Sequence, residues 1–68
     1  MYHVMPGDTL ILGGGMFRTV LDVHLTRTSG YVSVKGTLGE ARKTELLDML
    51  TLIRHIESGW VTVRRGES

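Results

Sequence analysis

The sequence of 68 residues has no cysteine, one proline and four aromatic residues. The lack of cysteine excludes the disulfide framework on which small secreted domains commonly depend. No apolar run approaches the roughly 18 residues that span a bilayer, so no membrane span is expected. Apolar residues at 41% and charged residues at 22% argue against intrinsic disorder. We therefore expect one small folded domain over residues 1–68.

The sequence also has little excess charge of either sign. Its eight Lys and Arg residues nearly balance its seven Asp and Glu residues, and the formal net charge is +1. This near balance does not favour a general binder of polyanions. The first twelve residues include Pro6 and Asp8 and have no basic start, unlike a secretory signal. The expected location is the cytoplasm.

Groups that carry chemistry are sparse. The three histidines, His3, His24 and His55, fall on separate segments without ligand spacing, so no metal site is predicted. The triplet Gly13-Gly14-Gly15 has neither the lysine of a Walker loop nor the spacing of a dinucleotide fingerprint, so we interpret it as a turn. No nucleophile beside a base and no carboxylate pair is recognisable, and we expect no catalytic site and no cofactor.

The first half of the chain has the pattern of strands. Branched apolar residues predict a strand over residues 8–13, and the glycine triplet allows the chain to reverse there. Residues 17–27 then alternate, with Phe17, Leu21, Val23 and Leu25 on one face.

A third strand, residues 31–35, follows the dipeptide Ser29-Gly30, for which we expect a two-residue hairpin loop. The register that this loop predicts pairs Thr28 with Tyr31, Thr26 with Ser33 and His24 with Lys35. In that register Val32 and Val34 share the apolar face of the second strand, which a slip of one residue would prevent.

After Gly36 the period changes to that of a helix, expected over residues 40–58. Thr37 and Glu40 have the spacing of a capping box, and Gly59 suits the position just past the helix end. Residues 60–64 alternate again as a last strand, with Trp60 expected in the core. The predicted fold is α+β, in the order β-β-β-α-β, with the helix packed on a small twisted antiparallel sheet through Leu46, Leu50 and Ile53.

Apolar residues cover more than half of the predicted helix, and a lone helix on a small sheet cannot bury all of them. Leu47 and Leu52 flank the inward arc, and the predicted protein or oligomer interface consists of Leu47, Met49, Leu52 and Ile56. The favoured partner for this interface is a second copy of the chain in a symmetric dimer, and the other candidate is a different protein. The alternative explanation is an ordinary singly exposed leucine.

The polar face of the second and third strands offers a different function. Basic and hydroxyl residues there, with one aromatic side chain for stacking, suit a nucleic-acid backbone. The possible contact residues are Arg18, Tyr31, Lys35, Arg64 and Arg65. Asp22 lies among them, and a mixed polar strand face is commonly just the solvated side of a sheet.

The residues from Pro6 to Gly13, Phe17 to Val23 and Ser29 to Val34 resemble the opening strands of small SH3-like barrels. In size and texture the chain also looks like the small uncharacterised accessory proteins of actinobacterial phages. That resemblance implies expression in the cytoplasm of an infected host and a non-catalytic role. We expect a non-enzymatic protein-interaction module that self-associates and binds a protein partner, with nucleic-acid binding as the alternative.

Overall fold

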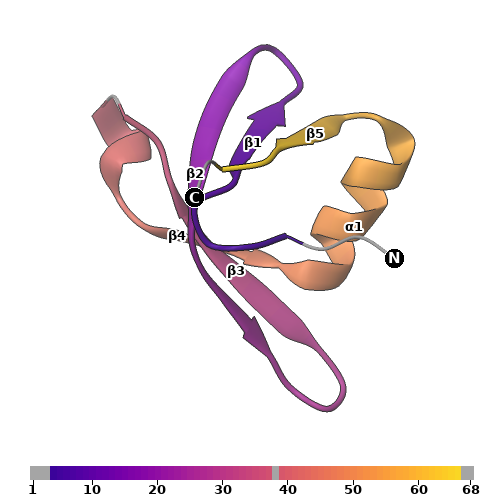
Figure 1. Ribbon diagram of the computed structural model, residues 1–68. Helices are drawn as coiled ribbons and strands as arrows, with labels where there is room; N and C mark the ends of the chain where they lie inside the picture. Colours follow the sequence, from indigo (N-terminus) through magenta and orange to yellow (C-terminus); the bar gives the residue numbers. More distant parts are fainter. Residues whose placement is uncertain (1–3, 38, 67–68) are drawn as a thin grey trace.

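The computed structural model describes residues 4–37 and 39–66, which form one sheet with a single α-helix (Figure 1). The elements are β1 (Thr9–Leu12), β2 (Met16–Leu25), β3 (Gly30–Lys35), the 3-10 helix η1 (Gly39–Arg42), β4 (Glu45–Asp48), α1 (Met49–Ser58) and β5 (Val61–Arg64). Neighbouring strands are all antiparallel, in the order β4-β3-β2-β1-β5. The expected α+β class is confirmed.

The two edges of the sheet are β4 and β5, and α1 connects them. Among the described residues β4 pairs only with β3, and β5 pairs only with β1. The helix packs against both edge strands and against β3. The helix therefore bridges the two edges, which form no ladder with each other among the described residues, and the similarity to small SH3-like barrels stays a prediction.

The largest difference from the sequence analysis lies in residues 40–58, predicted as one helix. The helix is shorter, Met49–Ser58, and a fourth strand, Glu45–Asp48, precedes it. Leu46 and Leu47 are good helix formers, but this segment lies against β3, with Leu47 opposite Val32. Cross-strand pairing outweighs the local preference here.

The hairpin between β2 and β3 turns through residues 26–29, a longer loop than predicted. Leu25 pairs with Gly30, and the backbone N–H of Thr26 donates to the Ser29 carbonyl at 2.7 Å. The backbone N–H of Ser29 in turn donates to the Thr26 hydroxyl at 3.0 Å. These bonds close the tip of a hairpin that projects from the rest of the molecule (Figure 1).

The longer loop makes the predicted register wrong by four positions. His24 pairs with Tyr31 instead of Lys35, and the other two predicted pairs are absent from the ladder. Because the slip is even, Val32 still shares a face with Val23, as predicted, and the two residues are now directly opposite each other.

A β-bulge in β2 reverses which alternate residues face the core. The register shifts between Val20 and Asp22, so Leu21 is an extra residue opposite β3. Val20, predicted on the polar face, is buried, whereas Phe17, predicted to face the core, is 54% exposed. Strict alternation therefore holds on each side of the bulge but not through it.

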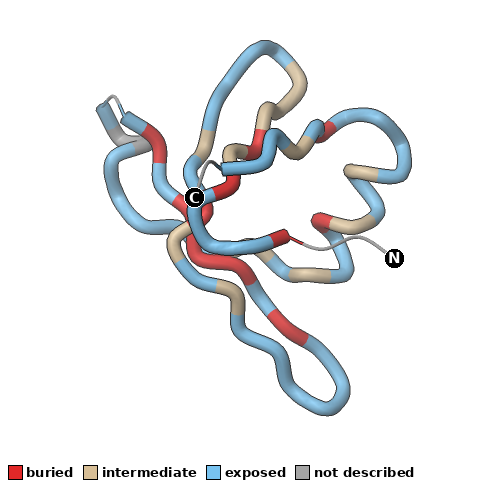
Figure 2. The backbone as a smooth tube through the Cα atoms, viewed as in Figure 1, coloured by how far each residue is buried: buried red, intermediate tan, exposed pale blue. Residues whose placement is uncertain are grey.

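The core lies where the strands cross near the centre of the molecule (Figure 2). Its buried apolar residues are Val4, Leu10, Val20, Val32, Val34, Leu52 and Val61. Leu25, also predicted to be core, is exposed because the hairpin extends beyond the sheet neighbours that would cover it.

The helix faces the core with a different stripe from the predicted one. Leu52 is 3% exposed, and Met49, Ile53 and Ile56 beside it are half-buried, at the spacing of one helix face. Leu50, predicted to pack inward, is 58% exposed. Leu46 was also predicted to pack inward from the helix, but it lies in β4 and is exposed. The inward stripe follows from a helix that starts at Met49 and bridges β4 to β5.

Candidate functional site

The junction between β4 and α1 consists of a single residue. Asp48 is the last residue of β4 and also the N-cap of α1, with extended backbone at φ −63° and ψ 130°. Its Oδ2 accepts hydrogen bonds from the backbone N–H of Thr51 at 3.0 Å and from the Thr51 hydroxyl at 3.1 Å. The helix therefore starts immediately at the sheet edge, and its direction is set by this cap.

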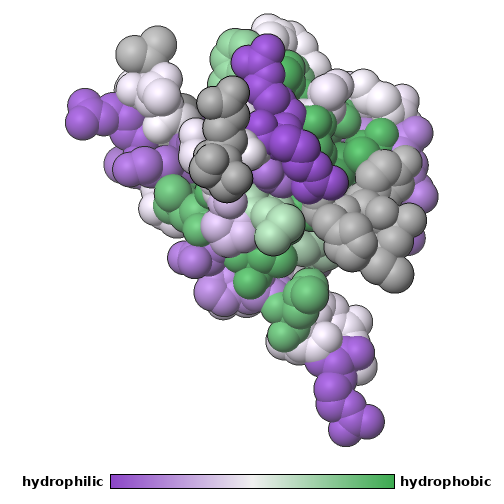
Figure 3. Space-filling model, in the orientation of Figure 1, coloured by the Kyte–Doolittle hydropathy of each residue, from purple (hydrophilic) through white to green (hydrophobic). Residues whose placement is uncertain are grey.

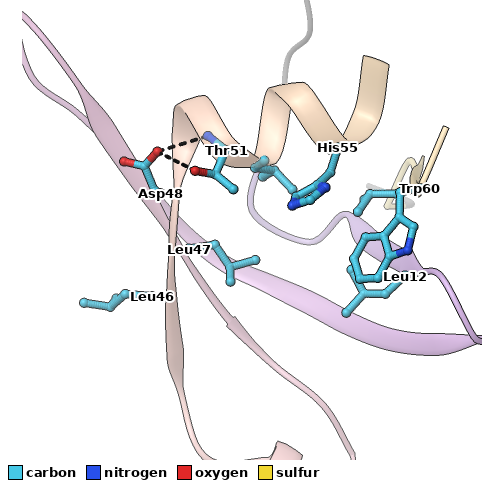
Figure 4. Close-up of a pocket in the computed structure, with 9 residues that line it drawn as sticks. Leu12, Leu46, Leu47, Asp48, Thr51, His55 and Trp60 are labelled. Carbon is cyan, nitrogen blue, oxygen red and sulfur yellow. Dashed lines mark hydrogen bonds between the residues drawn. The ribbon is translucent and has the colours of Figure 1, made fainter. Parts of the chain in front are cut away.

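An apolar cavity of about 330 Å³ lies between this helix and the two edge strands. Its lining residues are Leu12, Leu46, Leu47, Asp48, Thr51, Leu52, His55, Trp60 and Val61. Figure 4 shows Leu47 pointing from β4 into this space, with Leu12 and Trp60 at its far end. Five of the lining side chains are Leu or Val, so the cavity suits an apolar group.

Trp60 forms one wall of the cavity and is 49% exposed, so its predicted place in the core is wrong. It directly follows Gly59, which ends α1 in the left-handed conformation at φ 87°, as predicted. The indole lies 5.0 Å from the His55 ring, centroid to centroid, at 44°. A Cβ atom on Gly13 would lie 2.5 Å from Trp60 Nε1, so the indole also packs directly on the first glycine of the β1–β2 turn. Residues from two elements therefore hold Trp60 at the surface.

Two unpaired strand edges border the cavity. The side of β4 away from β3 and the side of β5 away from β1 make no ladder to another described strand. Such edges present backbone N–H and C=O groups that another extended chain can use. Asp48 is the only Asp, Glu, Lys or Arg residue among those that line the cavity, and the exposed Glu45 begins the same strand.

The residues predicted as the protein or oligomer interface do not form an exposed surface. Leu52 belongs to the core, and Leu47, Met49 and Ile56 are partly buried against it. Only Leu47 and Leu52 of the four line the cavity. Trp60, His55 and Asp48 line the cavity but were not among the predicted site residues. The spacing of Asp48 and Thr51 was the available signal for a helix start.

The residues predicted for nucleic-acid contact are divided by the sheet. Lys35 pairs with Thr19, and Arg64 pairs with Thr9, which itself pairs with Thr19. Lys35 and Arg64 therefore lie on one face, at the ends of a row across four strands.

Arg18 lies on the other face, because it is opposite the buried Leu10. Tyr31 is on the outer face farther along β3 and stacks on His24, with centroids 4.5 Å apart and planes 20° apart. The structure thus brings together two of the five residues, with Tyr31 nearby.

Arg65, the last of the five, is engaged with a buried carboxylate. Asp8 is 3% exposed and accepts bonds from Arg65 Nη1 at 3.2 Å and from the backbone N–H groups of Met5 and Gly66. Burial alone raises the pKa of Asp8, but the Gly66 and Met5 N–H groups and the Arg65 guanidinium outweigh it and hold that pKa below 3.8. Arg65 therefore has a structural contact.

Comparison with protein-family models, with curated proteins and with solved structures finds no significant match. The resemblance to phage accessory proteins therefore stays a prediction. No helix in the described part of the chain is long and apolar enough to cross a membrane. Among residues 4–37 and 39–66, no three His, Asp or Glu residues lie together as metal ligands would; His3 is outside these residues.

Proposed function

We propose that this chain is a non-enzymatic protein-interaction module, and that it binds an extended segment of another protein at the cavity beside Trp60. The observation that carries the proposal is an apolar cavity that lies between two unpaired strand edges. The half-exposed Trp60 in its wall is the type of residue that dominates binding energy at protein interfaces.

An extended segment fits this place better than a helix. A strand added to the free side of β4 forms backbone hydrogen bonds, and every second side chain then points to the side of Leu47, which lines the cavity. A large apolar side chain is the expected anchor. Glu45 and Asp48, at the two ends of β4, favour a segment with Lys or Arg beside that anchor.

Self-association is the other expectation, and the structure weakens its basis. It depended on Leu47, Met49, Leu52 and Ile56 as surplus apolar surface, and these side chains pack on the core of their own subunit. We therefore favour a different protein as the occupant of the cavity. A second copy of the chain is the competing occupant.

The proposal is tested with a display library of random extended peptides selected on the full chain. The expected peptides share one large apolar residue with Lys or Arg nearby, and they shift the backbone amide signals of β4 in NMR spectra. Trp60→Ala should weaken their binding about tenfold, since an aromatic hot spot commonly contributes more than 1 kcal/mol. Leu50→Ala is the matched control, because Leu50 is exposed and does not line the cavity.

A selection that yields no peptide, or peptides whose binding Trp60→Ala leaves unchanged, overturns the proposal. Sedimentation at micromolar concentration examines the competing occupant. A dimer that Trp60→Ala dissociates would assign the cavity to a second copy and also overturn it. A monomer supports a foreign partner.

A further inference from the structure

The outer face of the sheet carries a row of four polar side chains across four strands. The paired residues, in order, are Arg64 of β5, Thr9 of β1, Thr19 of β2 and Lys35 of β3. The chain neighbours of these residues point inward, because Leu10, Val20 and Val34 are all buried. Since side chains alternate along a strand, the row points to solvent.

The row carries two positively charged side chains, Lys35 and Arg64, and both are available to bind an anion. In the described part of the chain the side chains of Lys35 and Arg64 have no hydrogen bond or ion pair, and both residues are exposed. Three strand spacings of about 4.8 Å separate them by about 14 Å along the sheet. That length is about four times the roughly 3.4 Å rise per nucleotide of one strand in a B-form duplex, so at least two phosphates of a more extended single strand fit along the row.

An exposed aromatic side chain lies directly beside the row. Phe17 is two residues before Thr19 in β2 and therefore on the same face, about 7 Å along the strand. It is opposite Ile11, and Ile11 is opposite Thr62, so this second row has no charge. Nothing in the fold needs an aromatic residue at a solvated position, whereas a base can stack on it.

Among the described strand residues, an acidic side chain limits the surface at the end beyond Lys35. Asp22 lies opposite Ser33, one row beyond Lys35 on the same face, and neither of the first two rows contains a carboxylate. Figure 3 shows hydrophilic and hydrophobic side chains interspersed over the side of the molecule seen there. A local cluster, and not the net charge of +1, must therefore supply any affinity for anions.

We propose that this face binds single-stranded nucleic acid, with Lys35, Arg64 and the threonine hydroxyls on phosphates and Phe17 stacked on a base. Hydroxyl and basic side chains are the usual phosphate contacts, and stacking on aromatic residues is tolerant of sequence. A duplex does not fit as well, because its bases are already stacked on one another and are not free to stack on Phe17. The site is separate from the cavity beside Trp60, so either can fail alone.

The test measures fluorescence anisotropy of a labelled thymidine oligonucleotide of about 12 nucleotides, from about 50 to about 200 mM salt. The double variant Lys35→Ala/Arg64→Ala should reduce the slope of log K against log salt by about 1.4, since each single-strand phosphate contact contributes about 0.7. Phe17→Ala should weaken binding about tenfold and leave the slope unchanged, because it removes stacking and no charge.

The matched control is Arg27→Ala/Arg54→Ala, which removes the same charge from the hairpin tip and the helix, where both residues are exposed. A control that loses as much slope as the double variant overturns the proposal, as does the absence of binding at the lowest salt. Equal competition by a duplex or by polyglutamate also overturns it, because either result removes the role of stacking. All of the variants are at exposed positions, and their melting temperatures confirm that each is folded.

Discussion

Arg65 and Asp8 are 57 positions apart in the chain and form an ion pair, with 3.2 Å between Arg65 Nη1 and Asp8 Oδ2. Backbone N–H groups complete the site: that of Met5 donates to Oδ2 at 2.9 Å, and that of Gly66 donates to Oδ1 at 3.0 Å. One buried carboxylate thus joins the segment before β1 to the segment after β5. The contact holds the two paired strands together at their open ends.

Asp8→Asn should lower the free energy of unfolding by about 1–3 kcal/mol at neutral pH, because buried donors lose their charged acceptor. The folded pKa of Asp8 lies below the unfolded value, so its stabilisation is present above about pH 4 and is lost as pH falls through the folded pKa. The variant should therefore lose less stability than the natural chain in acid. Urea denaturation at neutral and acid pH measures both effects.

Asp22→Asn is the control for this change, since Asp22 is exposed and lies outside the Asp8 site. Equal stability losses in the two variants would contradict the role of the buried carboxylate.

Leu52→Ala should cost about 2–5 kcal/mol, because it creates a cavity in the core. Leu50→Ala should change stability by about 0.5 kcal/mol or less, since Leu50 is exposed two residues away on the same helix. Denaturant unfolding of the two variants shows which face of α1 packs on the core. A larger loss for Leu50→Ala would restore the helix face expected from the sequence.

Asp48→Ala should lower stability by about 1 kcal/mol, because Thr51 loses its capping partner. Thr37→Ala should have little effect, since the helix that Thr37 was predicted to cap begins twelve positions later, at Met49. Thermal unfolding followed by circular dichroism compares the two variants. A loss confined to Thr37→Ala would argue for the longer predicted helix.

Gly13→Ala should move the indole of Trp60, because the new Cβ atom would lie 2.5 Å from its Nε1. Trp60 is the only tryptophan, so its emission spectrum reports the movement directly. Gly14→Ala is the contrasting variant: it has open space but a φ of 89°, so it should lose about 1–2 kcal/mol of stability with unchanged emission. Unchanged emission in Gly13→Ala would show that the indole does not pack on this turn.

Several features were predictable because their signals are local. The glycine triplet turns with positive φ at Gly14 and Gly15, and Gly59 ends the helix as expected. The last strand also forms, one residue shorter than predicted, at Val61–Arg64. Each of these features depends on the conformation that a few adjacent residues prefer.

The candidate sites were less accessible to sequence analysis. The expectation of a surplus apolar helix face failed because Leu47 belongs to a strand and Leu52 to the core. The row from Arg64 to Lys35 depends on the pairing of four strands, which no spacing in the sequence contains. Trp60 was expected in the core because aromatic residues are few, yet its place beside Gly13 leaves it half-exposed.

The sequence by itself determined the α+β class, the turn at the glycine triplet and the C-terminal end of the helix, because glycine conformation and residue periodicity act over a few neighbours. The tertiary structure alone decided that Glu45–Asp48 is a strand and that β2 changes its inward face at Leu21. A segment of four residues fits a helix or a strand almost equally well. The hydrogen bonds and apolar contacts supplied by β3 then select the strand, and they come from a part of the chain that local patterns do not include.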